Sequence, residues 1–184
     1  SIYANEAVNQ GGAIFNRGQA EIREATSISS NTAKTGGGIY NSEGGQLVIN
    51  TASQIFANAA TGNGLLEGRG GGIANFGGLV TITDAYIGFN TSLNEGGGLY
   101  SEGNAWLTNV NIEQNQATNA NRGKGGGIYV RSGFMILISG CRVAGNTAVV
   151  QNGGNGICLH PAGFLDALSP PNDITDAITN DPTP

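Results

Sequence analysis

The feature that most constrains this chain is a pair of short motifs that recur along residues 1–160. The first motif is a glycine-rich run followed by an aliphatic residue. Its six copies end at Ile14, Ile39, Ile73, Leu99, Ile128 and Ile157. The aliphatic residues of successive copies are 25 to 34 residues apart. This period is too short for a four-stranded propeller blade, which needs about 40 residues, and it is typical of a solenoid.

The second motif is an aliphatic residue followed three positions later by asparagine. Its six copies end at Asn5, Asn31, Asn58, Asn90, Asn115 and Asn146. Between the two motifs lies a third apolar segment with alternation, as in Leu47 and Ile49 or Val80 and Ile82. A spacing of two is the periodicity of β-strands, and no segment carries the sustained stripe of an amphipathic helix.

These patterns predict an all-β chain that forms a right-handed, single-stranded parallel β-helix of about six coils. One coil cannot bury its own apolar edge, so coils stack strand on strand, with equivalent residues about 4.8 Å apart. We expect the aliphatic residues to form an inward ladder. We expect the asparagines to form a second ladder at a turn, since asparagine tolerates the left-handed backbone region and its amide can bond to neighbouring asparagines. The handedness follows from the preference of parallel crossovers.

The composition excludes several classes of protein. Charged residues make up 11% of the chain, and its eight Lys and Arg cannot form the basic stripe that nucleic-acid binding requires. No apolar run approaches 18 residues, so no transmembrane helix is expected. The glycines form no phosphate-binding motif of a nucleotide site. We therefore expect no nucleic-acid partner, no membrane span and no cofactor.

The two ends of the chain differ from its middle. We expect residues 1–160 to form the repeats and residues 161–184 to form a C-terminal cap and an extended, Pro-rich tail, because all five prolines fall in the latter range. Residues 164–168 are expected to cover the last coil. The chain begins within a coil, which favours a fragment of a longer protein or a subunit of an end-to-end assembly, with other subunits or further repeats at the rod ends.

The repeats resemble those of a known family. Gly11-Gly12-Ala13-Ile14 matches the Gly-Gly-Ala-Ile tetrapeptide of the polymorphic outer membrane proteins of chlamydiae and related bacterial β-helix surface proteins. Their second tetrapeptide, Phe-x-x-Asn, has Ile or Val in place of Phe in every copy here. The resemblance covers roughly residues 1–160. It implies a secreted or bacterial cell-surface protein that is often adhesive.

The loops between each asparagine and the next glycine run are a first candidate site. They contain 11 residues after Asn58 and 9 after Asn115, but 4 to 6 elsewhere. Insertions at one phase of a solenoid gather on one edge. The long loops carry Glu67, Arg69, Arg122 and Lys124. They predict a partner-binding or glycan-binding edge, with tolerated surface insertions as the alternative.

The residues that directly follow the aliphatic ladder are a second candidate site. They are Phe15, Tyr40, Ala74, Tyr100, Tyr129 and Cys158. Strand alternation points them outward, which predicts an aromatic stripe interrupted at Ala74. Aromatic faces suit sugar or protein binding. The alternative is cross-strand stacking that stabilises the solenoid.

Catalysis on a polysaccharide is the competing function class, because many β-helices perform it with clustered carboxylates. It requires acids that converge on one sugar, or several oxygens around a metal ion. The candidate acids, spread over the repeats, are Glu21, Glu43, Glu67, Asp84, Glu95, Glu102 and Glu113. His160 is the single histidine, and a structural role is expected for it. We expect no catalytic or metal-binding residue.

Cys141 and Cys158 occupy different positions in the repeat. Two buried free thiols are the favoured interpretation, and a disulfide is the alternative. Taken together, the sequence predicts a non-enzymatic extracellular or cell-surface structural or adhesion module that binds other subunits or glycans. A carbohydrate-active or carbohydrate-binding β-helix is the alternative.

Overall fold

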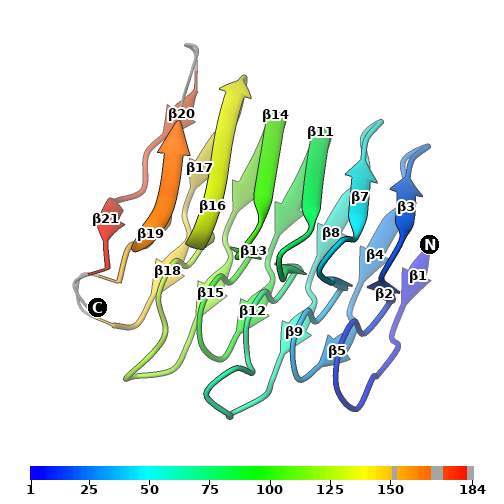
Figure 1. Cartoon of the computed structure of the whole chain (residues 1–184), viewed down its shortest axis with the longest axis horizontal. Helices are drawn as coiled ribbons and strands as arrows, with labels where there is room; N and C mark the ends of the chain where they lie inside the picture. The colour runs from blue at the N-terminus through cyan, green and yellow to red at the C-terminus, as the bar shows by residue number, and fades with distance from the viewer. Residues whose placement is uncertain (151–152, 167–171, 182–184) are drawn as a thin grey trace.

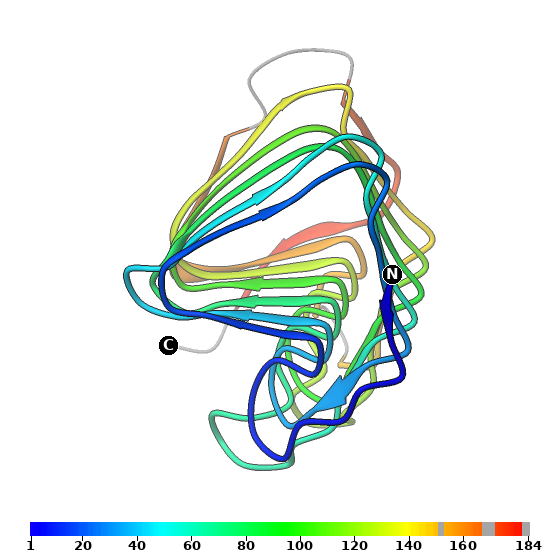
Figure 2. The ribbon, with the colours of Figure 1, turned by 90° about the vertical axis from the view of Figure 1, so that its right-hand side faces the viewer.

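The computed structural model describes residues 1–150, 153–166 and 172–181, and its regular elements there are all β-strands. The strands stack in parallel into a solenoid of about six turns (Figure 1), as the repeats predict. Seen from the N-terminal end, the chain winds clockwise as it recedes from the viewer (Figure 2), which is the right-handed sense. No helix in these described ranges is long and apolar enough to cross a membrane.

Each coil contributes strands to four runs along the rod. The first run contains β2 (Ile14–Asn16), β6 (Ile39–Asn41), β10 (Ile73–Asn75), β13 (Leu99–Ser101), the starts of β16 (Ile128–Ser139) and β19 (Ile157–Asp166), and β21 (Ile178–Asn180). The second run contains β3 (Gln19–Ile22), β7 (Gln46–Ile49), the first halves of β11 (Leu79–Gly88) and β14 (Asn104–Glu113), and the later parts of β16 and β19.

The remaining two runs complete each coil. The third run contains β1 (Ile2–Tyr3), β4 (Ser27–Ser29), β8 (Gln54–Phe56), the second halves of β11 and β14, β17 (Arg142–Ala144) and β20 (Asp173–Ile174). The fourth run contains β5 (Thr32–Ala33), β9 (Ala59–Ala60), β12 (Thr91–Ser92), β15 (Gln116–Ala117) and β18 (Thr147–Ala148). In Figure 2 the first three runs enclose a triangular body, and the fourth run and its loops form a lobe below it.

The aliphatic ladder forms the centre of the core. Strand pairing aligns the six aliphatic residues of the glycine motif from Ile14 to Ile157, each directly over the next. From Ile39 onward these side chains are fully buried. Burying each one stabilises the fold by about 1.5–3 kcal/mol. The predicted inward ladder and its register are therefore confirmed.

The asparagine ladder is confirmed as well, and it runs in one direction. Each asparagine donates its backbone N–H and its Nδ2 to the Oδ1 of the asparagine in the following coil, at 2.9–3.0 Å. The series ends at Asp176, whose Oδ2 accepts both donors of Asn146 at 2.8 Å. The side chain of aspartate lacks the amide N–H groups of asparagine, so Asp176 closes the ladder.

The left-handed residue at this turn is not the asparagine. Positive φ angles of 54 to 66° belong to the residues that precede the six asparagines, Ala4, Ser30, Ala57, Phe89, Gln114 and Gly145. The expectation that asparagine itself would use its tolerance for this conformation is wrong. The preceding residue turns the chain, which leaves the asparagine N–H and amide aligned with the rod axis for the ladder.

The glycine runs make the opposite corner. The first glycine of each run has a φ of 62 to 68°, a region that costs L-residues energy. At the second position the coils approach closely, and a Cβ on Gly97 would collide with the carbonyl oxygen of Gly126 in the next coil. Glycine is therefore required there by sterics.

Parallel stacking continues past residue 160, where the sequence predicted that the repeats end. β19 pairs with β16 as far as Asp166, and Phe164 lies beside Phe134 instead of folding over the last coil. β20 and β21 add strands to the third and first runs. Pro161 lies in β19 where the register with β16 shifts. The other four prolines lie outside the described residues.

Asn90→Ala should destabilise the solenoid by about 3 kcal/mol or more. The substitution leaves the backbone N–H and one Nδ2 hydrogen of buried Asn58 without an acceptor, and it removes the Asn90 Nδ2 donor from the carbonyl oxygen of Ile55 and from Asn115 Oδ1. Urea unfolding followed by circular dichroism measures the change. Asn121→Ala, at an exposed loop position, is the control and should shift stability by less than about 0.5 kcal/mol. Equal effects of the two variants would contradict a structural role for the ladder.

Candidate functional site

The predicted aromatic stripe is a continuous stack of rings, here called the aromatic strip. Its members are Phe15, Tyr40, Phe76, Tyr100 and Tyr129, with successive ring centroids 5.3, 5.1, 5.1 and 5.8 Å apart. Phe76 lies two residues after Ala74 on the same outward face, and its ring fills the gap that the sequence predicted there. The expected interruption at Ala74 is therefore wrong.

The aromatic strip is largely buried. Tyr100 and Tyr129 are 0% and 2% exposed and Tyr40 is 8% exposed, whereas Phe15 at the N-terminal end is 41% exposed. The rings stack mostly face to face, so their faces contact one another along the rod. At the N-terminal end of the stack, the Arg17 guanidinium lies 5.1 Å from the Phe15 ring centroid. The geometry favours the alternative role, cross-strand stacking that stabilises the solenoid.

A ladder of charged residues packs against the aromatic strip. Arg69, Glu95 and Lys124 each precede a glycine run, and backbone hydrogen bonds to the adjoining glycines stack them in successive coils. Arg69 donates from Nε to Glu95 at 2.7 Å, and its guanidinium lies 5.0 Å from the centroid of the Tyr100 ring. The charges therefore alternate along the rod, with Arg69 paired to Glu95 and Lys124 paired to Asp181.

Asp181 closes the C-terminal end of the aromatic strip. Its Oδ1 lies 2.6 Å from Lys124 Nζ, and its Oδ2 accepts the hydroxyl of Tyr129 at 2.7 Å. It reaches across a coil whose side chains at these two phases are small, Gly153 and Cys158. No sequence pattern predicted this contact, because Asp181 lies in the segment expected to be a tail.

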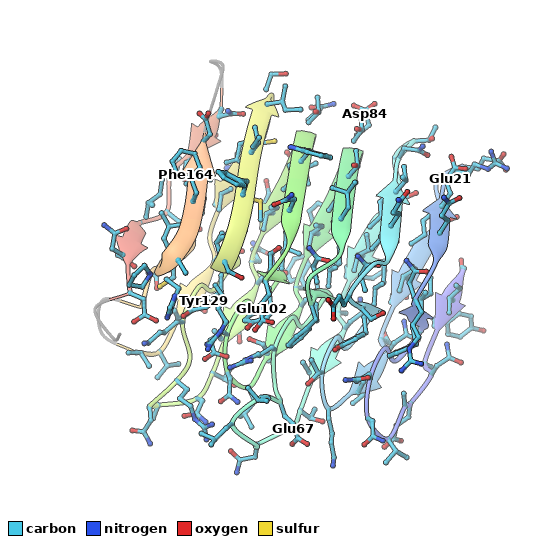
Figure 3. The ribbon with its side chains drawn as sticks, viewed as in Figure 1. Glu21, Glu67, Asp84, Glu102, Tyr129 and Phe164 are labelled. Carbon is cyan, nitrogen blue, oxygen red and sulfur yellow. The ribbon has the colours of Figure 1, made fainter. Side chains whose placement is uncertain are left out.

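Two of the seven candidate acids converge. Glu102 accepts the hydroxyl of Tyr100 and lies 3.7 Å from Arg69 Nη1, so Glu95 and Glu102 share one guanidinium. The other acids lie elsewhere: Figure 3 shows Glu21 and Asp84 at the upper end of the strands and Glu67 near the lower edge. Glu113 pairs with Arg142, and Glu43 is exposed. Within the described ranges, no three His, Cys, Asp or Glu side chains are close enough to hold a metal ion.

Burial changes the chemistry of the tyrosines and thiols. It raises the pKa of Tyr100 and of Tyr129 far above the ordinary value, and the hydrogen bonds to Glu102 and Asp181 raise both further. Cys141 and Cys158 are free and buried, which confirms the favoured interpretation. Burial also raises the pKa of the Cys158 thiol to about 11, so this thiol stays protonated and unreactive near neutral pH.

The two long loops meet on one edge of the rod, as predicted. The Arg122 guanidinium donates to the carbonyl oxygens of Asn63 and Gly64, both at 3.4 Å, across the shorter loop between them. The tip of the first loop exposes Leu65 by 80% and Leu66 by 68%. Arg69 anchors this tip by donating to the carbonyl oxygen of Leu65 at 3.0 Å.

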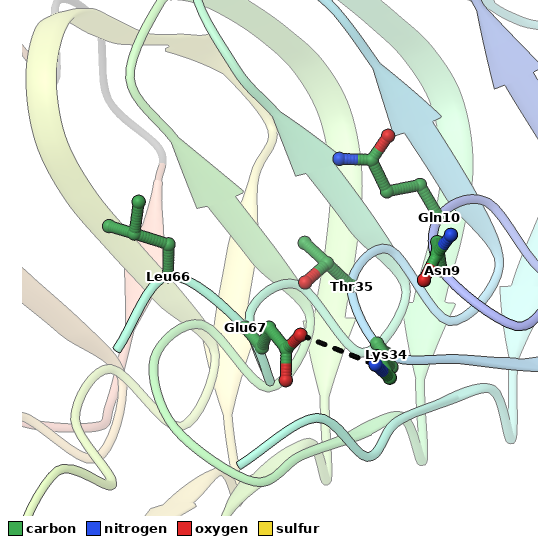
Figure 4. A pocket seen from close by; sticks show the side chains of 6 residues that line it. All are labelled: Asn9, Gln10, Lys34, Thr35, Leu66 and Glu67. Carbon is green, nitrogen blue, oxygen red and sulfur yellow. Dashed lines mark ion pairs between the residues drawn. The ribbon is translucent and has the colours of Figure 1, made fainter. Parts of the chain in front are cut away.

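A hollow of about 320 Å³ lies between this loop and the first two coils (Figure 4). It is lined by Asn9, Gln10, Lys34, Thr35, Leu66 and Glu67. Lys34 and Glu67 form an ion pair at 3.6 Å across it. The hollow can hold a small polar group but offers no convergent catalytic set.

The four predicted loop residues divide into two pairs. Glu67 and Arg122 lie at the surface, where a partner can reach them. Arg69 is 3% exposed, and Lys124 is paired with the buried Asp181. The expectation of a surface contact is wrong for Arg69, because its side chain lies against the aromatic strip. Arg69 and Lys124 stabilise the rod from within.

No family model matches the chain, and no curated protein or solved structure is detectably similar to it. The function must therefore be argued from the chain's own geometry.

Arg69→Leu should cost about 3–5 kcal/mol, because it leaves the largely buried Glu95 carboxylate without its cation. The double variant Arg69→Leu with Glu95→Leu should recover much of this loss, since an apolar pair can replace a buried ion pair. Urea unfolding measures both. Arg23→Leu, which removes an exposed ion pair, is the control and should cost about 1 kcal/mol or less.

The two buried tyrosines should make the protein sensitive to alkali. In the unfolded chain tyrosine ionises near about pH 10, whereas folded Tyr100 and Tyr129 keep their protons because their pKa values are raised. Their contribution to stability is complete below about pH 10. Above it, the free energy of unfolding should fall by about 1.4 kcal/mol per pH unit for each tyrosine.

Urea unfolding over the alkaline range measures this slope. Tyr129→Phe should reduce the slope by about 1.4 kcal/mol per pH unit, because it removes one of the two tyrosines whose pKa is raised. An unchanged slope in this variant would show that Tyr129 ionises equally in both states.

Proposed function

We propose that this chain is a non-enzymatic structural and adhesion module, displayed outside the cell or on a bacterial cell surface. One observation carries the proposal: the chemically versatile side chains are used inside the rod. Tyr100 and Tyr129 stack, while Arg69 and Lys124 neutralise Glu95 and Asp181. Such an arrangement supports rigidity, which suits a rod that carries contact surfaces. The proposed location rests on the family resemblance of the glycine motif.

A carbohydrate-active β-helix is the second candidate. Glu95 and Glu102 share Arg69 beside the hydroxyl of Tyr100, which brings two acids, a cation and a phenol together. A catalytic pair must reach the substrate directly. Tyr100, Arg69 and Glu95 are 0%, 3% and 9% exposed, so a sugar cannot reach all three without displacing covering residues. The burial of these side chains therefore favours the structural role over catalysis.

The polarity of the asparagine ladder bears on what stacks at the rod ends. At the first coil, no residue of the described ranges donates to Asn5 Oδ1, the position at which each later asparagine accepts two N–H groups. At the other end Asp176 presents acceptors. Head-to-tail stacking of identical chains would bring these acceptors together. We therefore expect that identical chains do not stack head to tail through this ladder.

An array of glycans and extracellular proteins tests the proposal. We expect saturable binding of the full chain without release of soluble sugar products, and equal binding by Glu102→Gln. Time-dependent release of reducing ends that Glu102→Gln abolishes would favour the carbohydrate-active alternative. No binding to any spot would remove the adhesion role.

A further inference from the structure

The outward side of the second run carries a second set of aromatic residues, apart from the aromatic strip. Its strands β3, β7, β11, β14, β16 and β19 lie side by side at the front of Figure 1. Alternate residues such as Leu47, Val80 and Leu107 point into the core and are 0–1% exposed. The residues between them point outward, and the regular register places them in straight rows across the strands.

Two of these rows are rich in apolar side chains, here called the flat face. The first row aligns Val48, Thr81, Trp106 and Ile136. The second row contains Gln46, Leu79, Asn104, Phe134 and Phe164. Phe134 and Phe164 pack edge to face with centroids 5.5 Å apart, and they are 54% and 52% exposed.

The solenoid does not need these side chains in order to fold. In the first coil the same positions are held by Gln19 and Glu21, and β3 pairs with β7 in the same register. Trp106 and Phe134 lie on the side of the sheet opposite to the core cluster. A contiguous apolar surface that folding does not require marks a binding site.

The flat face is uncharged from β7 to β16, and a carboxylate borders it at each end, because Glu21 pairs in register with Val48 and Asp166 with Ile136. Among its described outward positions from β7 to β16, no residue is Asp, Glu, Lys or Arg. Its polar members, Gln46, Thr81 and Asn104, carry amides and a hydroxyl, and Thr83 and Thr108 continue the same outward side in the next row. Next to Val48 a hollow of about 310 Å³ is lined by Gln19, Ala20, Glu21, Gln46 and Val48.

We propose that the flat face binds an uncharged polysaccharide, with sugar rings against Trp106, Phe134 and Phe164. This inference rests on the proposed adhesion role and supplies its ligand class and contact surface. Aromatic side chains offer apolar area to the C–H faces of sugars, and amides and hydroxyls can both donate to and accept from sugar hydroxyls. A face without a cation that is bordered by carboxylates cannot offset the desolvation of an anionic polymer.

The size of the face also favours a glycan over a folded protein or a second copy of this chain. Five strands at about 4.8 Å and four residue steps at about 3.3 Å give roughly 320 Å². A stable protein interface buries about 800 Å² per partner. An extended polymer can instead follow the rows and gain affinity from repeated small contacts.

Trp106 is the only tryptophan of the chain, so its fluorescence reports on this face directly. The probes are four neutral polymers, mixed-linkage β-glucan, xylan, galactomannan and dextran, with polygalacturonate as the anionic comparison. We expect at least one neutral polymer to shift the emission to shorter wavelength and to protect it from acrylamide quenching. A response to polygalacturonate alone, or to none of the five, would overturn the proposal.

Variants locate the contact. Trp106→Ala and Phe134→Ala should each weaken binding about threefold to tenfold in affinity gel electrophoresis. Phe89→Ala removes a ring that is 55% exposed at the turn before Asn90, outside the flat face, and should keep the parent affinity. Circular dichroism verifies folding of each variant, and Phe164→Ala replaces any that fails to fold.

The outcomes separate this inference from the proposed function. Binding that survives the flat-face variants overturns the flat face as the site and leaves the adhesion role intact. If the chain binds none of the polymers but binds a protein on the array specifically, the flat face is likewise overturned as a glycan site and the adhesion role stands. Absence of binding in both experiments overturns both proposals.

Discussion

The asparagine ladder is the interaction on which the rest of this structure depends. It fixes one corner of every coil to the same corner of the next coil, because each side chain accepts two N–H groups from its neighbour and donates to another. With that corner fixed, the strands that follow must pair in one register. The aliphatic ladder then lies inside, and the loops between the corner and the next glycine run are left free to vary in length.

The same repetition determines what the outward residues can do. Equivalent side chains lie one strand spacing apart, so each meets its own counterpart above and below. Aromatic residues therefore stack, as Tyr100 and Tyr129 do, and charges must alternate, as in Arg69, Glu95 and Lys124. Where the counterparts are exposed and uncharged, as around Trp106, they extend into a flat surface. The buried aromatic and charged residues and the flat face therefore have the same origin, the alignment of equivalent residues in successive coils.

The features that recur in every coil could be predicted from the sequence. The features that depend on contacts between particular coils, or on how the chain folds around each coil, could not. The ladders of Ile14 and Asn5 were predictable because their phase is constant. The positive φ angle was predicted at the asparagine instead of at the residue before it. Those preceding residues, such as Ala57, Phe89 and Gln114, share no chemical property that would identify the position. The burial of Tyr100 was missed because the outward side of a strand is not the surface of the molecule when loops fold against it. Asp176 and Asp181 act on coils that precede them, and the flat face is recognisable only once the register is known.

The closure of the asparagine ladder by Asp176 has a consequence for how such a chain can change its length. A segment of one period, copied in tandem inside the rod, would arrive with its own donor on one side and its own acceptor on the other. It would therefore fit without any new interface. A copy placed after Asp176 would set acceptor against acceptor, because its asparagine oxygen would face the Asp176 carboxylate. An inverted copy inside the rod would set donor against donor at one of its two junctions. Replacing an amide by a carboxylate, a change of one functional group, thus marks the last rung of the ladder.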